Sequence, residues 1–153
     1  MIKKQSSAIL YNGVIFIVAK QGTESVPAPT DKISTSLLTD DICDIGGKLS
    51  ESLNSFIPSR QRFTREDWKK VNLPLLELSG VKTEKLLFGN AKLVQVGQLN
   101  EIITIYPTTN NGWKNIENKT LADKAISLNV NEINNCDLGL ALVNAFEIST
   151  LKV

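Results

Sequence analysis

Apolar, β-branched residues open the chain in two runs separated by a short polar break, a pattern that favours strands. The segment from Ser6 to Lys20 is interrupted by Asn12-Gly13, the dipeptide best suited to the positive φ angles of a two-residue hairpin turn. Its second arm, Val14 to Val18, is apolar at every position, so both of its faces should be buried inside a sheet. The sequence therefore predicts a β-hairpin, then a loop over residues 21–32 and an extended segment over residues 33–37.

A four-residue pattern, Cys-Asp-Ile-Gly in one copy and Cys-Asp-Leu-Gly in the other, occurs at residues 43–46 and 136–139, an offset of 93. Around each copy, apolar residues recur at helical spacing, and cap-forming Ser, Thr, Asp or Asn residues precede it. We therefore expect two amphipathic helices, the first of which ends before Pro58.

The repeated glycine and cysteine carry separate expectations. A glycine inside a helix costs about 1 kcal/mol relative to alanine, so Gly46 and Gly139 should each face a closely packed neighbour. The two cysteines form no C-x-x-C pair, and a structural zinc site or a disulfide framework is not indicated. We expect Cys43 and Cys136 to be buried free thiols in a reducing cytoplasm, outside bonding distance of each other.

Basic and aromatic residues cluster in the segment from Ser59 to Lys70. Such interleaving can mark a nucleic-acid-binding surface, but Thr64-Arg65-Glu66-Asp67 also has the form of a capping box that starts a helix. In that structural interpretation Pro74 interrupts the helix and Gly80 ends it, while the cations stay in water. The side chains expected on the buried side of this helix are those of Trp68, Val71, Leu75 and Leu78.

Alternating and β-branched segments return between Lys82 and Tyr106, where turn residues separate them. Since no regular alternation of strands with long crossover helices occurs, we predict the α+β class: a mainly antiparallel sheet of about five to seven strands with about three amphipathic helices packed on it. The strands expected from this region onward are Glu84–Phe88, Lys92–Val96, Glu101–Tyr106, Trp113–Ile116 and Lys124–Val130.

The composition excludes several classes of function but does not identify the function. The 153 residues favour one domain over residues 1–153, and 17 basic against 16 acidic residues give no global field for nucleic acid or membrane. No histidine is present, which removes the usual general base, metal ligand and pH switch. Gly46-Gly47-Lys48 lacks the remainder of a phosphate-binding loop. We expect no enzyme, no cofactor, no metal and no membrane span, and we do not expect Ala8–Ala19, broken by Asn12-Gly13, to act as an export signal.

Several short segments, in this order and spacing, together resemble one family. The matching segments are Asp44-Ile45-Gly46, Ser59-Arg60, Leu75-Leu76, Leu87-Phe88, Ile105-Tyr106-Pro107-Thr108, Gly112-Trp113 and Asp137-Leu138-Gly139. The resemblance extends over about residues 33 to 150 and is to the cytoplasmic immunity proteins of bacterial contact-dependent growth inhibition systems, of the kind that neutralise nuclease toxins. It implies a non-enzymatic α+β protein that binds the C-terminal toxin domain of an adhesin delivered by a sibling cell and blocks its active site.

Two modes of toxin binding follow as hypotheses. An acidic patch at the start of the first helix could hold a cationic toxin surface, or the toxin could pair its main chain with an exposed edge of the Lys92–Tyr106 strands. We expect a mixture of the two. The residues predicted to contact the toxin are Asp40, Asp41, Asp44, Glu51, Gln95, Gln98 and Glu101. The alternative function is a single-stranded nucleic-acid-binding module built on the Arg60–Lys70 cluster.

Overall fold

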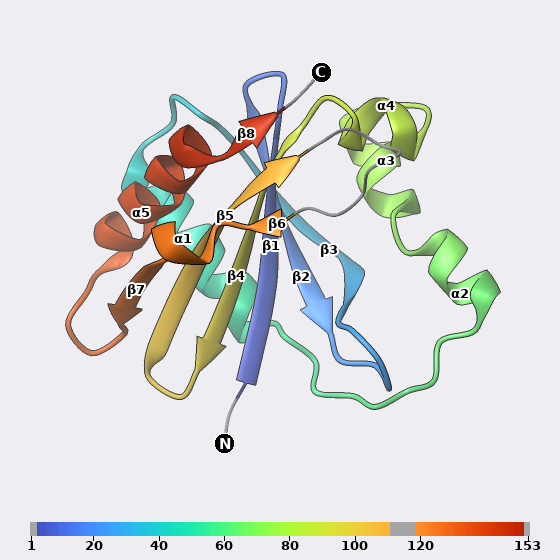
Figure 1. The fold of residues 1–153 in the computed structure, drawn as a ribbon, viewed down its shortest axis with the longest axis horizontal. Helices are drawn as coiled ribbons and strands as arrows, with labels where there is room; N and C mark the ends of the chain where they lie inside the picture. Colours follow the sequence, from blue (N-terminus) through green and yellow to red (C-terminus); the bar gives the residue numbers. More distant parts are fainter. Residues whose placement is uncertain (1–2, 111–118, 152–153) are drawn as a thin grey trace.

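A twisted antiparallel sheet lies between two groups of helices in the computed structural model, which describes residues 3–110 and 119–151 (Figure 1). The strand order is β3-β2-β1-β4-β5-β6, and β7 and β8 also pair with β5, β8 in parallel. This confirms the predicted α+β class. The strands are β1 (Lys3–Tyr11), β2 (Val14–Gln21), β3 (Ala28–Leu37), β4 (Lys92–Leu99), β5 (Ile102–Asn110), β6 (Lys119–Thr120), β7 (Ile126–Asn129) and β8 (Thr150–Leu151). The helices are α1 (Ile42–Asn54), α2 (Arg65–Lys70), α3 (Leu73–Ser79), α4 (Glu84–Phe88) and α5 (Asn135–Ile148), with a 3-10 turn at Ala122–Lys124.

The N-terminal hairpin forms as predicted. Asn12 and Gly13 have φ angles of 53° and 80°, and Tyr11 faces Val14 across the turn. Strand β2 lies between β1 and β3, and its residues from Ile15 to Ala19 are buried. Strand β3 begins at Ala28, earlier than the expected extended segment, because Pro29 is tolerated on this edge strand beside an irregularity in the β2 register.

One predicted strand is wrong. Residues 84–88 form the short helix α4, in which the Thr83 side chain accepts a hydrogen bond from the Leu86 amide and so caps the first turn. A short apolar run cannot be distinguished as strand or helix by periodicity alone, and the cap decides it here. Strands β4, β5 and β7 bear out the other expectations for this half, whereas the expected strand at Trp113–Ile116 lies outside the described residues.

Helices α1 and α5 cover one face of the sheet and build the larger core. Along each strand, every second side chain points toward these two helices, because successive side chains of a strand lie on opposite faces of the sheet. Helices α3 and α4 cover part of the opposite face with a smaller cluster. The larger cluster contains Ala8, Ile15, Ile17, Ile45, Leu49, Leu53, Val94, Val96, Ile103, Ile105, Leu138, Ala141, Leu142, Ala145 and Phe146. The smaller cluster contains Ile9, Phe16, Val18, Leu75, Leu87, Ala91 and Leu93.

The two repeated glycines lie where α1 meets α5. A Cβ atom added at Gly46 would overlap the backbone oxygen of Asn135, and one added at Gly139 would overlap the backbone oxygen of Ile42. These contacts are equivalent, because each glycine meets the residue four positions before the other glycine. The expectation of a close packing partner for both glycines is confirmed, and the two helices touch backbone to backbone through a local pseudo-twofold arrangement.

The expectation for the cysteines is wrong on both points. Cys43 and Cys136 form a disulfide, with their Cα atoms 3.8 Å apart, and each is half-buried. The same close contact explains the error: residues at equivalent positions beside a pseudo-twofold axis face each other. A bond that joins residues 93 apart in sequence therefore links the first turns of α1 and α5.

The basic and aromatic segment from Ser59 to Gly80 partly follows its prediction. The capping box of Thr64 and Asp67 is present, a second helix restarts at Leu73 with Pro74 in its first turn, and Gly80 ends it with a φ of 72°. Its burial is shallower than expected. Of the four side chains assigned to the buried side, only Leu75 is buried, and Leu78 is 51% exposed. Helix α2 is a short helix of 6 residues, none of which is buried. The segment therefore contacts the sheet less than the prediction of a buried helix face implied.

Candidate functional site

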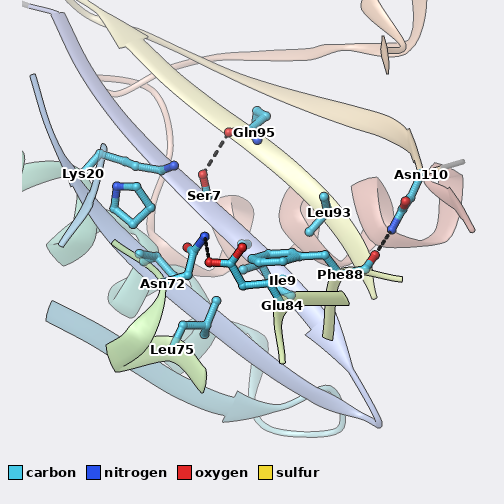
Figure 2. A pocket seen from close by; sticks show the side chains of 13 residues that line it. Ser7, Ile9, Lys20, Asn72, Leu75, Glu84, Phe88, Leu93, Gln95 and Asn110 are labelled. Carbon is cyan, nitrogen blue, oxygen red and sulfur yellow. Dashed lines mark hydrogen bonds between the residues drawn. The ribbon is translucent and has the colours of Figure 1, made fainter. Parts of the chain in front are cut away.

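The face of the sheet under α3 and α4 contains a pocket of about 350 Å³ (Figure 2). Its floor is formed by β1, β2 and β4, and the helices supply the opposite wall. The lining is mainly apolar, with a few polar side chains that converge on the cavity. Among the residues that line it are Ser7, Ile9, Val18, Lys20, Pro29, Asn72, Leu75, Glu84, Phe88, Leu93, Gln95 and Asn110.

Lys20 is the only cation among the described residues that line the pocket. It follows Phe16 and Val18 in the same phase of β2, so the alternation that buries those side chains carries the lysine side chain onto the same face. Burial lowers the pKa of Lys20 from 10.5 to about 8. Within the described parts of the chain, neither a carboxylate nor a hydrogen-bond acceptor pairs with its amine.

A hydrogen bond on the pocket floor orients a second polar group. The Ser7 hydroxyl donates to Oε1 of Gln95 at 2.9 Å, as Figure 2 shows. Since the oxygen of the amide is used in this way, the Gln95 amide nitrogen is left as a donor with no partner in the described residues. Lys20 and Gln95 thus supply only hydrogen-bond donors to the cavity.

The helical wall carries Glu84, the one acid found in the described part of the lining. The side-chain amide of Asn72 donates to Oε1 of Glu84 at 3.2 Å, which joins the start of α3 to the start of α4. Deeper in, the side-chain amide of Asn110 donates to the carbonyls of Phe88 and Ala91, both at 2.6 Å. These bonds fix the wall against the sheet and keep the pocket open as a preformed space.

The predicted acidic residues of α1 come together at the first turn of that helix. Asp41 caps the helix by accepting from the Cys43 amide at 2.7 Å, and Asp40 accepts from the Leu37 amide at 2.8 Å. Asp44 follows in the first turn and is exposed. Glu51 lies further along the helix, where it forms an exposed ion pair with Lys32 at 3.7 Å.

Sequence reasoning missed two acids that belong to the same surface. Because the disulfide joins the starts of α1 and α5, Asp137 lies beside it as the counterpart of Asp44, and Glu132 precedes α5; both are exposed. The repeated pattern already contained this signal, since 44 and 137 differ by the same 93 positions as the cysteines. No ion pair to these acids occurs among the described residues. We call Asp40, Asp41, Asp44, Glu132 and Asp137 the acidic patch.

The other three predicted contact residues do not form one surface. Gln95 faces the pocket on the α3 and α4 side, whereas Gln98 has the phase of Val94 and Val96 and lies on the α1 and α5 side. Gln98 donates to the Asn100 carbonyl at 2.9 Å, and Glu101 is exposed in the adjoining turn.

The expected pairing of a toxin strand with the Lys92–Tyr106 meander is contradicted by the topology. Strand β4 lies between β1 and β5, and β5 also pairs with β7, so these ladders are already occupied. Within residues 3–110 and 119–151, strand β3 instead has a ladder partner on one side only. Even there, the Lys48 amine donates to the Thr35 carbonyl at 2.6 Å and covers part of the edge.

The basic and aromatic cluster behaves as a local structural unit. The rings of Phe63 and Trp68 lie 5.1 Å apart between centroids and at 56° to each other, the geometry of an aromatic pair. Arg62 is within 3.7 Å of the Glu24 carboxylate, and Lys69 pairs with an acid of its own helix. These contacts favour the structural interpretation over a surface for single-stranded nucleic acid.

The described residues contain no group of three or more His, Cys, Asp or Glu side chains placed to hold a metal ion. Nor does any helix in this part of the chain have both the length and the apolar character needed to cross a membrane.

The fold places the chain in a class of α+β proteins with a helix-covered antiparallel sheet, and two solved structures share it. A protein of unknown function from Neisseria meningitidis has a TM-score of 0.80 and 15% identity, with 97% of this chain and 96% of that chain covered. A CdiA-CT/CdiI toxin and immunity complex from Yersinia pseudotuberculosis has a TM-score of 0.74 and 14% identity, with coverage of 97% and 98%. No match was found among curated protein sequences.

A family model identifies the chain more closely. The model of the CDI immunity protein family, CdiI, matches residues 33–149, which is most of the sequence. The chain therefore belongs to the CdiI family of immunity proteins, where CDI stands for contact-dependent growth inhibition.

Proposed function

We propose that this protein binds the C-terminal toxin domain of its cognate CDI adhesin in the cytoplasm and neutralises it by covering the active site. The observation that carries the proposal is the family match over residues 33–149. The similarity of the fold to a CdiA-CT/CdiI toxin and immunity complex supports it. On this proposal the protein acts by binding and performs no catalysis.

The acidic patch is the surface that best suits a nuclease toxin. A nuclease needs a positive surface to hold the phosphate backbone of its substrate, and an inhibitor that occupies this surface gains from complementary charge. The net charge of the whole chain is only +1, so the acids matter through their local concentration at the starts of α1 and α5. Among the described residues, the side chains of two of them, Asp44 and Glu132, form no hydrogen bond or ion pair that holds the fold together.

Growth rescue tests the proposed role directly. The toxin is the C-terminal domain of the adhesin encoded upstream, and its expression alone should stop growth. Co-expression of this chain should restore growth, and the purified proteins should form a complex. Failure of the wild-type chain both to bind and to rescue would refute the immunity function.

Charge reversal tests the acidic patch without removing a cap. Asp44→Lys combined with Glu132→Lys should weaken toxin binding by roughly tenfold or more at low salt, with a smaller effect at high salt. Glu77→Lys combined with Glu147→Lys is the matched control, since both acids are exposed and lie outside the patch. Equal toxin affinity for the two double variants would remove the patch from the interface.

Competition tests whether the active site is covered. A catalytically inactive toxin variant should bind its nucleic-acid substrate alone but not in the presence of a stoichiometric excess of this protein. Formation of a ternary complex of toxin, nucleic acid and this chain would show inhibition at a distance instead.

A further inference from the structure

The pocket under α3 and α4 has the composition of a small-molecule site rather than of a packing defect. Its volume of about 350 Å³ lies at the lower end of the range of roughly 300–1,000 Å³ that is usual for such sites. An apolar lining with a small number of convergent polar groups is also their usual character. A packing defect would be lined by apolar atoms alone and would not hold a lysine amine.

We propose that this pocket binds a small monocarboxylate with an apolar body, whose carboxylate is held by the Lys20 amine and the Gln95 amide. Nothing in the proposed toxin binding requires this site, which lies on the face of the sheet opposite α1 and α5. The inference therefore stands or falls independently of the immunity function.

The hydrogen-bond donors of Lys20 and Gln95 favour an anionic ligand. The Lys20 ammonium offers three hydrogens and the Gln95 side-chain nitrogen two, and neither group has an acceptor in the described residues. The bond from Ser7 to Gln95 holds the amide in the orientation that presents its nitrogen rather than its oxygen (Figure 2). A carboxylate accepts from both donors at once, and charge-assisted hydrogen bonds of this kind are stronger than neutral ones.

The rest of the lining limits the charge and polarity of the ligand. Glu84 is on the helical wall, where its repulsion disfavours phosphates and dicarboxylates that carry a second negative charge. The remaining contact area is apolar and comes from both the sheet and the helices, which suits an aliphatic or aromatic body. These apolar side chains are those of Ile9, Val18, Leu75, Phe88 and Leu93.

Binding can be measured on the isolated protein with simple probes. Phenylacetate and hexanoate are the acids, phenylacetamide is the neutral analogue, and phenethylamine is the cationic one. In an amide-resolved NMR titration the acids should shift the resonances of Ser7, Leu93 and Gln95, and should bind at least roughly tenfold more tightly than phenylacetamide. No saturable shift with either acid, or equal affinity for the acid and the amide, would overturn the proposal.

A pair of lysine variants provides the control. Lys20→Met keeps the length of the side chain and should weaken acid binding by roughly tenfold or more while phenylacetamide is unaffected. Lys32→Met removes an exposed lysine of β3 and should leave acid binding unchanged. If Lys20→Met is folded by its NMR spectrum and still binds the acids as the wild type does, the amine is not the anchor and the proposal is wrong.

The pH dependence supplies a readout that a purely structural lysine would not give. The acid affinity should be constant near neutrality and should fall as the pH rises through the pKa of about 8 of the free Lys20 amine, because only the ammonium form attracts the carboxylate. Among the described residues, Glu84 is the other charged side chain that lines the cavity. An acid affinity independent of pH between 7 and about 10 would contradict the assignment to Lys20.

Discussion

Replacing Gly46 with alanine tests the close contact of α1 and α5 most directly, and Gly47 provides a control in the same helix. Both substitutions gain the same helix propensity, about 1 kcal/mol. They differ in the space available to the added Cβ atom. An added Cβ at Gly47 meets only the Asn135 side-chain amide, at 3.4 Å, whereas one at Gly46 would lie 2.7 Å from the backbone nitrogen of Gly139 and closer still to the Asn135 oxygen.

The geometry sets the size of the effect. Ordinary contacts between such atoms are about 3.5 Å, so the helices would have to separate by about 0.8 Å or more, and the Cys43–Cys136 bond resists that movement. Overpacking in a tight interior costs about 1–3 kcal/mol. Gly46→Ala should therefore be less stable than Gly47→Ala by about this amount, which corresponds to a difference of about 2–12 °C in Tm for a domain of this size.

Urea denaturation followed by circular dichroism, without reductant, gives both free energies of unfolding under one condition. Gly47→Ala should equal or slightly exceed the wild type, and Gly46→Ala should unfold at lower urea concentration with a similar m value. If the two variants have the same midpoint, the backbone contact is looser than described and the reasoning from the repeated glycine is wrong.

Further predictions concern the disulfide, a helix cap and the core. Cys43→Ser combined with Cys136→Ser should lower the free energy of unfolding by up to about 5 kcal/mol, because the bond closes a loop of more than ninety residues; equal urea midpoints for the oxidised wild type and this variant would contradict it. The backbone N–H of Thr64 and, second, its hydroxyl donate to the Asp67 carboxylate and lower its pKa, so Thr64→Ala, which removes only the hydroxyl, should raise that pKa part of the way in an NMR titration, and the contribution of the cap should be lost as the pH falls through the pKa of Asp67. Leu142→Ala, at a fully buried position, should cost about 2–5 kcal/mol in the same urea assay, and a cost under about 1 kcal/mol would show that the site collapses around the cavity.

The disulfide also bears on where the protein works. Disulfides are rare in a reducing cytoplasm, the compartment that the proposed function requires. The free energy of unfolding of an ordinary domain is about 5–15 kcal/mol. Loss of the bond would lower it by up to about 5 kcal/mol. The state of the two thiols in cells can be read by trapping with a maleimide. The reduced protein should remain folded, since the glycine contacts do not depend on the bond.

The sequence predicted the parts of the fold that depend on interactions between residues close together in the chain. Asn12-Gly13 specified its hairpin because positive φ angles are available to few residues, and the repeated pattern located both long helices. The helix α4 was missed because five residues are too few to reveal a period. The Cys43–Cys136 bond was missed because it depends on how two distant helices cross.

The candidate sites show the same division. Asp40, Asp41 and Asp44 are neighbours in sequence, so their grouping could be read directly, but Glu132 and Asp137 join them only through the helix contact. The lining of the pocket comes from five strands and two helices, and it has no local signature apart from Lys20. A lysine that continues the buried phase of an apolar strand was the one available signal.

The contact between α1 and α5 resembles, within one chain, the self-complementary interface of a symmetric dimer, where each partner offers the other the same surface. One consequence is energetic coupling. After Gly46→Ala has pushed the helices apart, the space needed for Gly139→Ala already exists, so the double variant should cost less than the sum of the two single changes. Each side of such an interface constrains the other, and tolerated changes at the two glycines should therefore occur in pairs.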